Sequence, residues 1–289
     1  HTFIPGNTNV YNKDYSSYSL EDVCLEMSSL GKGDIREPFI EVTYPNGSST
    51  TDMVFDRAEI IQGKEEYDTL PGSYDDNGEV EQLVIYLKDR NYNLTLELHY
   101  YVYEKCDIIT RSAKLVNSGN ESVRLERLMS MQLDLNESDY ELSFFNGAWA
   151  REMNRSRIPI RAGKYVNESV TGTSSNRANP FFMIGRSSTT EDYGECYGFN
   201  LIYSGNHYEA AQVNSYGKLR LVSGINPATF SYIIEAGKCF EAPEAVLTYS
   251  YKGYNRMSHN MHEFVRKHIV RGSWRDKERP VLINSWEAA

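Results

Sequence analysis

Apolar and polar residues alternate along residues 94–103 of this 289-residue chain. Leu94, Leu96 and Leu98 fall on one face of an extended segment, whereas Glu97 falls on the other. A period of two residues is typical of a strand that buries one face and exposes the opposite one. The pattern therefore predicts a strand over this segment.

Two further runs continue this pattern. Residues 109–116 and 123–135 alternate in the same way, and Asn, Ser and Gly occupy the turn positions 117–120 between them. Together with residues 94–103, these runs predict an antiparallel meander. Further strands are expected at residues 82–87, 199–203, 218–222, 230–234 and 245–249.

The predicted strands are separated by clusters of Gly, Asn, Pro and Ser rather than by helical stretches. This order excludes a fold in which strands and helices alternate around a parallel sheet. The 22 Tyr and 11 Phe also favour strands on a wide, half-buried surface. We therefore expect an all-β fold.

One segment has the period of a helix instead. Met257 and Phe264 belong to an apolar stripe, Asn255 is a suitable N-cap, and Gly272 follows the last turn, so a helix is expected over residues 256–271. A final apolar run at 281–286, after a proline, resembles a buried strand that has only begun where the sequence ends.

Composition places the chain among folded globular proteins, because 40% of its residues are hydrophobic and 24% are charged. The net charge of −10 argues against a nucleic-acid partner, since neutralising phosphates requires a basic face. A neutral ligand is more compatible with this charge. No run of about 18 apolar residues occurs, so no membrane span is expected.

The cysteines lie far apart and lack CxxC or zinc spacing, which is typical of free thiols in a reducing compartment. We therefore expect a cytoplasmic protein. Six Asn-x-Ser/Thr sequons would be glycosylated in a secretory compartment, although a chain rich in Asn and Ser contains many by chance. The four cysteines are Cys24, Cys106, Cys196 and Cys239.

Candidate catalytic groups are few. Glycoside hydrolysis needs two carboxyl groups facing each other across a substrate, but the sequence offers only adjacent pairs, for which solvated turns are the ordinary interpretation. His259 and His262 could approach one metal ion from a helix, yet no third ligand is suggested. No metal or cofactor motif is found. The carboxylate pairs are Glu65-Glu66, Asp75-Asp76 and Glu191-Asp192.

The aromatic residues are more informative. Trp149, Trp274 and Trp286 could each stack on the apolar face of a sugar ring, although packing in a core is the ordinary role of a tryptophan. Arg36, in the Gly-rich segment 30–38, could donate hydrogen bonds to hydroxyl groups, and a surface salt bridge explains it equally well.

Several of these stretches carry a resemblance in collinear order. The chain resembles the N-terminal region of the glycoside hydrolase family 36 α-galactosidases. The matching segments are 107–112, 147–152, 174–181, 194–206 and 279–288, the last reading Arg-Pro-Val-Leu-Ile-Asn-Ser-Trp-Glu-Ala.

The resemblance implies a large antiparallel β-supersandwich of the galactose-mutarotase type over residues 1–250. A helical linker over 251–278 and the first strand of a (β/α)8 barrel over 279–289 would follow. A complete barrel needs roughly 250 further residues. Because the nucleophile and the acid/base of this family are both aspartates on the barrel, no catalytic residue is expected within this chain.

The resemblance also implies a function and two substrate-binding positions. The family hydrolyses terminal α-galactosyl groups of oligosaccharides such as raffinose and melibiose, with retention and without a cofactor. Trp286 matches a tryptophan that forms a wall for the galactose ring. Arg36 matches an arginine that reaches a neighbouring subunit's pocket in tetrameric members, although the loop here reads Leu-Gly-Lys-Gly-Asp-Ile-Arg instead of a Tyr-Gly-Asn pattern.

On this interpretation the chain alone is inactive and contributes to oligomerisation and to the entrance of the active site. One alternative is a stand-alone carbohydrate-binding β-sandwich module. Another is an enzyme similar to the aldose epimerases, which would need a His and a Glu facing one cleft. His99 and His207 are the candidates for that histidine.

Overall fold

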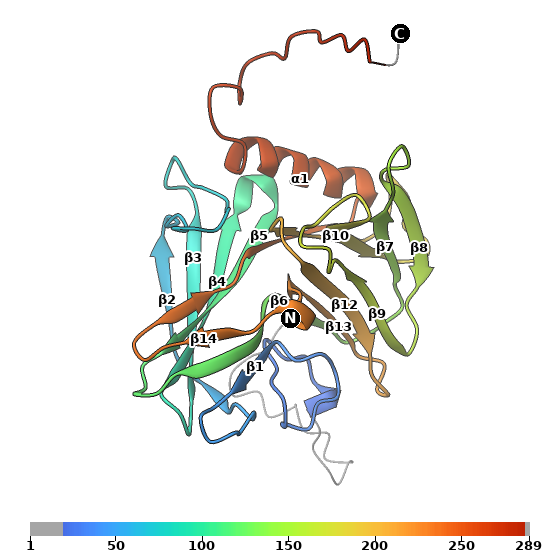
Figure 1. The fold of residues 1–289 in the computed structure, drawn as a ribbon. Coiled ribbons are helices and arrows are strands. Elements are labelled where there is room, and N and C mark those ends of the chain that lie inside the picture. The colour runs from blue at the N-terminus through green and yellow to red at the C-terminus, as the bar shows by residue number, and fades with distance from the viewer. Residues whose placement is uncertain (1–19, 287–289) are drawn as a thin grey trace.

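The computed structural model describes residues 20–286, and in them two antiparallel sheets pack face to face, with a helix on the outer face of the larger sheet (Figure 1). The predicted all-β, antiparallel fold is confirmed. The strands of the larger sheet, in spatial order, are β2 (Met53–Gln62), β3 (Glu81–Asp89), β4 (Leu94–Tyr103), β5 (Ile108–Asn117), β16 (Glu244–Ser250), β11 (Cys196–Ile202), β10 (Ala178–Gly185), β7 (Glu141–Asn146) and β8 (Asn154–Pro159), with β15 (Cys239–Glu241) paired to β5.

The smaller sheet lies against one face of the larger one. Three short 3-10 turns complete the described elements: η2 (Leu20–Asp22), η3 (Glu104–Cys106) and η4 (Pro227–Thr229). The strands of the smaller sheet, in order, are β1 (Ile40–Thr43), β6 (Val123–Leu135), β13 (Leu219–Ile225), β12 (His207–Val213) and β9 (Gly163–Glu168), with β14 (Tyr232–Ile234) paired to β6.

The eight runs predicted as strands between residues 82 and 249 all contain strands, but the predicted meander is wrong in its third member. β4 pairs with β5 along its whole length, whereas β6 pairs with β1, β13 and β14. The turn after Asn117 carries the chain from one sheet to the other, and the Asn117 side chain holds it by donating to the carbonyls of Glu121 and Ile234. Positions 128–132 of β6 are all buried, as expected for a strand covered on both faces.

The core fills the space between the two sheets. Leu94, Leu96 and Leu98, the predicted inner face of β4, are at most 2% exposed and pack against Leu125 of β6. Side chains i, i+2 and i+4 of a strand share one face, so the alternation read from the sequence identifies the buried side of β4 correctly.

The helix α1 (Gly253–His268) packs Tyr254, Met257 and Phe264 against the larger sheet. It begins three residues before the predicted start. Gly253 has a φ of 75°, and a Cβ there would lie 2.5 Å from the backbone of Glu191 and of Tyr193, so glycine is required at this turn.

The predicted strand at 281–286 is not formed. This segment has no regular secondary structure, and Val281, Leu282 and Ile283 are 86–97% exposed. A strand needs a neighbour to satisfy its backbone groups, and no described strand lies beside this one. Among the helices of residues 20–286, none is long and apolar enough to span a bilayer.

Candidate functional site

The adjacent carboxylate pairs have structural roles in the described chain. Asp75 accepts hydrogen bonds from the backbone N–H groups of Glu79 and Val80 and so closes a turn. Glu66, Asp76 and Glu191 form exposed ion pairs with arginines. Asp192 accepts a hydrogen bond from Asn255, the predicted N-cap, which instead lies inside the first turn of α1.

Arg36 is fully buried in an ion-pair network. Its guanidinium lies 2.9 Å from Asp34 and 3.3 Å from Asp134, and it also donates to the carbonyls of Leu20 and Val23. The expected salt bridge exists, but the surface location is wrong. An arginine held by two carboxylates and two carbonyls fixes the fold of the Gly-rich segment.

Arg220 completes this network from β13. It lies 2.8 Å from Asp34 and 2.7 Å from Asp134, and the side chains are 0–2% exposed. Burial by itself would raise the pKa of Asp34, but the hydrogen bond from Arg36 and the charge of Arg220 outweigh it and lower that pKa. Two cations and two anions therefore balance in the interior.

Trp149 lies at the tip of the β7–β8 hairpin and is 91% exposed. The backbone around it is tightly constrained. Ala150 and Met153 both have a φ of 57°, which is uncommon for residues other than glycine, and the Glu152 carboxylate accepts a hydrogen bond from the Ala150 N–H. A Cβ on Gly147 would lie 2.7–2.9 Å from three backbone atoms. The constrained backbone of this loop presents the Trp149 indole to solvent.

Trp286 and Trp274 are also exposed, at 86% and 51%. Arg279 stacks over the Trp274 ring at 5.4 Å. Within residues 20–286, none of the three tryptophans packs in the core. Trp286 follows the exposed apolar run 281–283, and together they form an apolar segment that the described residues leave uncovered.

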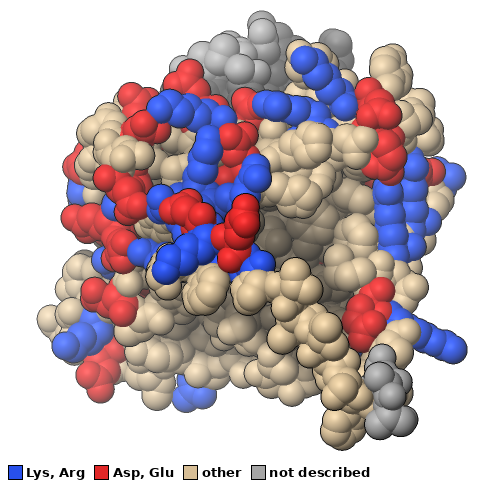
Figure 2. Space-filling view, turned by 90° about the horizontal axis from the view of Figure 1, so that it is seen from above, with Lys and Arg blue, Asp and Glu red and all other residues tan. Residues whose placement is uncertain are grey.

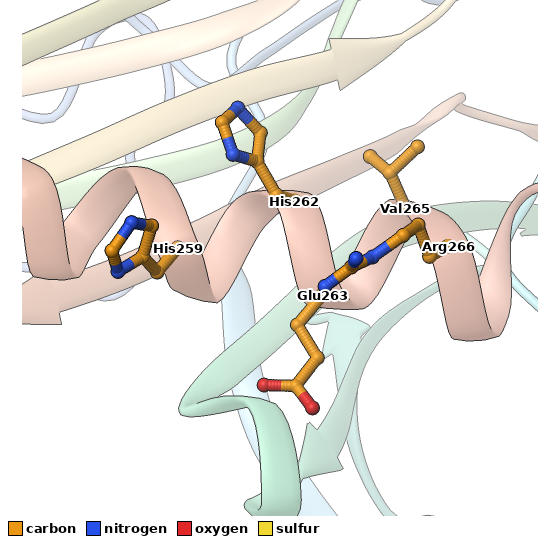
Figure 3. A pocket seen from close by; sticks show the side chains of 5 residues that line it. All are labelled: His259, His262, Glu263, Val265 and Arg266. Carbon is orange, nitrogen blue, oxygen red and sulfur yellow. The ribbon is translucent and has the colours of Figure 1, made fainter.

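His259 and His262 line a shallow pocket of about 550 Å³ on the outer side of α1. Figure 3 shows that their rings project in different directions from the helix. His262 lies 3.4 Å from Ser258. Over residues 20–286, no group of three or more His, Cys, Asp or Glu is arranged to hold a metal ion.

The two histidines considered for an epimerase lie in different sheets. His99 pairs with Gln82 and Glu97 on the outer face of the larger sheet. His207 shares the inner face of β12 with Glu209, a partner that spacing alone did not reveal, but these two are 0% and 2% exposed. A substrate cannot reach a pair so deeply buried, so the structure does not support the epimerase alternative.

Charge is distributed unevenly on the face that carries α1. Figure 2 shows acidic and basic side chains interleaved on the side of β2, β3 and β4, whereas the middle of this face is largely uncharged. The interleaved groups include the ion pairs of Arg57 with Glu59 and of Lys105 with Glu79.

Comparison with known proteins assigns the chain to a family. The model of the glycosyl hydrolase family 36 N-terminal domain matches residues 1–235, and the Melibiase model matches residues 239–289. The chain therefore belongs to glycosyl hydrolase family 36.

The relatives are α-galactosidases. The chain is 39% identical over 273 residues to α-galactosidase AgaA of Geobacillus stearothermophilus, which covers 94% of this chain and 37% of the relative. It is 34% identical over 286 residues to α-galactosidase 1 of Pediococcus pentosaceus, covering 99% of this chain and 38% of the relative. The chain thus spans little more than a third of the length of these proteins.

Solved structures give the same fold. The α-galactosidase of Lactobacillus brevis superposes with a TM-score of 0.91 at 39% identity, over 93% of this chain and 36% of that one. An AgaA variant of Geobacillus stearothermophilus in complex with raffinose gives a TM-score of 0.91 at 38% identity, over 97% and 39% of the two chains.

Proposed function

We propose that this chain is the non-catalytic N-terminal part of a retaining α-galactosidase. The observation that carries the proposal is the exposed apolar segment 281–286 within the part that matches the Melibiase model. Burying such a segment is favourable by about 25 cal/mol per Å². A strand placed in a barrel would bury these side chains and pair their backbone groups.

The proposed division of the chain follows from the same argument. Residues 1–250 would form the supersandwich, 251–278 a helical linker, and 279–289 the start of a (β/α)8 barrel. β16 ends at Ser250, the proposed end of the supersandwich, and α1 lies within the proposed linker. The Melibiase match begins earlier, at residue 239. The catalytic aspartates would then lie outside the chain.

The proposed substrates are terminal α-galactosides, by analogy with relatives solved with raffinose or stachyose. Trp286 would form a wall of the galactose pocket once the barrel surrounds it. For Arg36, direct contact with a sugar stays a prediction. Its buried ion pairs support an indirect role, in which it fixes the loop that precedes β1. A homotetramer and a cytoplasmic location complete the proposal, the latter supported by four free cysteines.

The experiment is a chimera in which residues 1–289 replace the corresponding part of the Geobacillus stearothermophilus enzyme. We expect the chimera to hydrolyse raffinose, and Trp286→Ala to reduce kcat/KM about tenfold or more through the lost ring contact. Trp274→Ala, a second exposed tryptophan, is the matched control and should change little. A chimera that folds without hydrolysing any α-galactoside would contradict the assignment.

A stand-alone carbohydrate-binding module is the second candidate. The exposed indole of Trp149, on a loop with a constrained backbone, favours it. A column that carries an immobilised polysaccharide with α-galactosyl branches would retain such a module, and Trp149→Ala would abolish this retention. If the unchanged chain and its Trp149→Ala variant elute from the column together, this candidate is excluded.

A further inference from the structure

A groove of about 1080 Å³ lies on the inner face of the larger sheet. Leu96 and Leu98 of β4 are buried in the core, whereas Val102, further along the same face, is 38% exposed. Ile109 of β5 and Tyr249 of β16 are 45% and 44% exposed. The apolar face thus continues from the core into a space that is open to solvent.

Several tyrosines line this groove. Tyr197 and Tyr249 come from the adjacent strands β11 and β16, with ring centroids 4.9 Å apart and planes inclined by 52°. Tyr251, at 65% exposure, and Tyr100 also line it. A phenol ring offers a flat apolar face and a hydroxyl at its edge, so it can contact ring C–H groups and hydrogen-bond to hydroxyls of one ligand.

A cluster of polar side chains, centred on Arg111, lies among these rings. The Arg111 side chain is 6% exposed, donates to the carbonyl of Gln132 and to the Tyr100 hydroxyl, and lies 2.9 Å from the Glu26 carboxylate. The Glu26 side chain is 45% exposed, so its carboxylate can accept further hydrogen bonds. Arg111 belongs to the segment 107–112 and Tyr197 to 194–206, two of the segments on which the family resemblance rests.

The charges that line the groove cancel. Three acidic side chains face three basic ones, and Asp107 is paired with Arg256 at 2.7 Å. A phosphate or a charged peptide would find no net charge to bind. The acidic residues are Glu26, Glu104 and Asp107, and the basic ones are Arg111, Lys252 and Arg256.

We propose that this groove binds a neutral oligosaccharide whose pyranose rings lie against Tyr249 and Tyr251 and whose hydroxyls bond to Glu26. The volume lies just above the usual range for small-molecule sites, so more than one sugar ring can enter. Only the class of sugar, the α-galactosyl oligosaccharides, rests on the proposed function.

The experiment is calorimetric titration of the 289-residue chain with raffinose and with melibiose, up to about 10 mM, which is enough to detect a Kd in the millimolar range. Tyr249→Ala and Tyr251→Ala should each weaken binding at least fivefold, and Tyr249→Phe should retain most of it because the ring face remains. Tyr216→Ala, at 53% exposure between β12 and β13, is the matched control and should bind as the unchanged chain does.

Thermal melting of every variant separates lost binding from lost folding. Because Tyr251 is mostly exposed, the Tyr251→Ala variant should have the same melting temperature as the unchanged chain. Absence of saturable binding to both sugars would overturn the proposal. Binding that survives both alanine variants, or that is lost in Trp149→Ala instead, would also overturn it. Failure of the α-galactosidase assignment would leave the binding result standing, because no step of this titration needs hydrolysis.

Discussion

Glu209 and His207 lie two residues apart on β12 with both side chains buried on the same face. Asn167 donates to one carboxyl oxygen of Glu209 at 2.6 Å, and the other oxygen has no partner among the described residues. His207 donates from Nε2 to the carbonyl of Ala178 at 3.2 Å, and its Nδ1 likewise has none. Burial raises the pKa of Glu209 to about 8 and lowers the pKa of His207 to about 4.

Replacing Glu209 by Gln should remove a pH-dependent loss of stability. The carboxyl titrates near 4.5 when unfolded and near 8 when folded, so the folded state holds its proton longer and stability falls as pH rises through this window. The loss amounts to something on the order of 4 kcal/mol at pH 8. Chemical denaturation should show Glu209→Gln more stable than the unchanged chain at pH 8 and nearly equal at pH 4.5. If the unfolding free energies of the two proteins vary with pH in parallel, this prediction is contradicted.

His207→Gln should change the acid side of the same profile. The folded pKa of His207 lies below its ordinary value of 6.5, so its contribution is present above pH 6.5 and is lost as pH falls toward 4. The difference in unfolding free energy between the unchanged chain and the variant should shrink by about 3 kcal/mol across that window. A difference independent of pH would show that His207 does not titrate there.

The ion-pair network behind the Gly-rich segment should be sensitive to the loss of one anion. Asp134→Asn leaves Arg36 and Arg220 sharing a single carboxylate, that of Asp34, in a fully buried site. Removing one partner of a buried pair costs about 3–5 kcal/mol. The exposed Arg57–Glu59 pair is the control, because Glu59→Gln should cost less than about 1 kcal/mol. If urea unfolding shows that Asp134→Asn and Glu59→Gln lose equal amounts of unfolding free energy, the proposed role of the buried network is refuted.

Gly253 should not tolerate alanine, whereas Gly272 should. Both have a positive φ, of 75° and 83°. A Cβ at Gly253 would lie 2.5 Å from backbone atoms, but at Gly272 nothing lies within 4 Å. Gly272→Ala should therefore cost about 1 kcal/mol from the backbone conformation alone. Gly253→Ala should cost clearly more and detach α1, which a loss of helical circular dichroism would reveal. Equal melting temperatures would contradict the close contact.

Alternation identified strands such as β4, in which one face is buried, but it gave no signal for β8 or β12. β8 is exposed along most of its length, so no apolar face marks it in the sequence. β12 fails for the opposite reason, since its small and polar residues, Glu209 among them, are nearly all buried. The crossing of β6 into the second sheet depends on contacts far apart in sequence, which a local period cannot contain.

The candidate site was less predictable than the fold. The family could be inferred from collinear segments, but the burial of Arg36 could not, because Asp134 lies nearly a hundred residues away in the sequence. The groove could not be predicted from the sequence for the same reason. Most of its tyrosines come from β4, β11 and β16, which are far apart in the sequence and are brought close together only by the strand order of the larger sheet.

The central proposal is that the catalytic aspartates of an α-galactosidase lie outside this chain. The most direct test is turnover of a chromogenic α-galactoside by the purified 289-residue chain. The account predicts no hydrolysis above the uncatalysed rate, at any enzyme concentration. Hydrolysis that co-purifies with the folded chain through successive columns, and scales with its concentration, would contradict it.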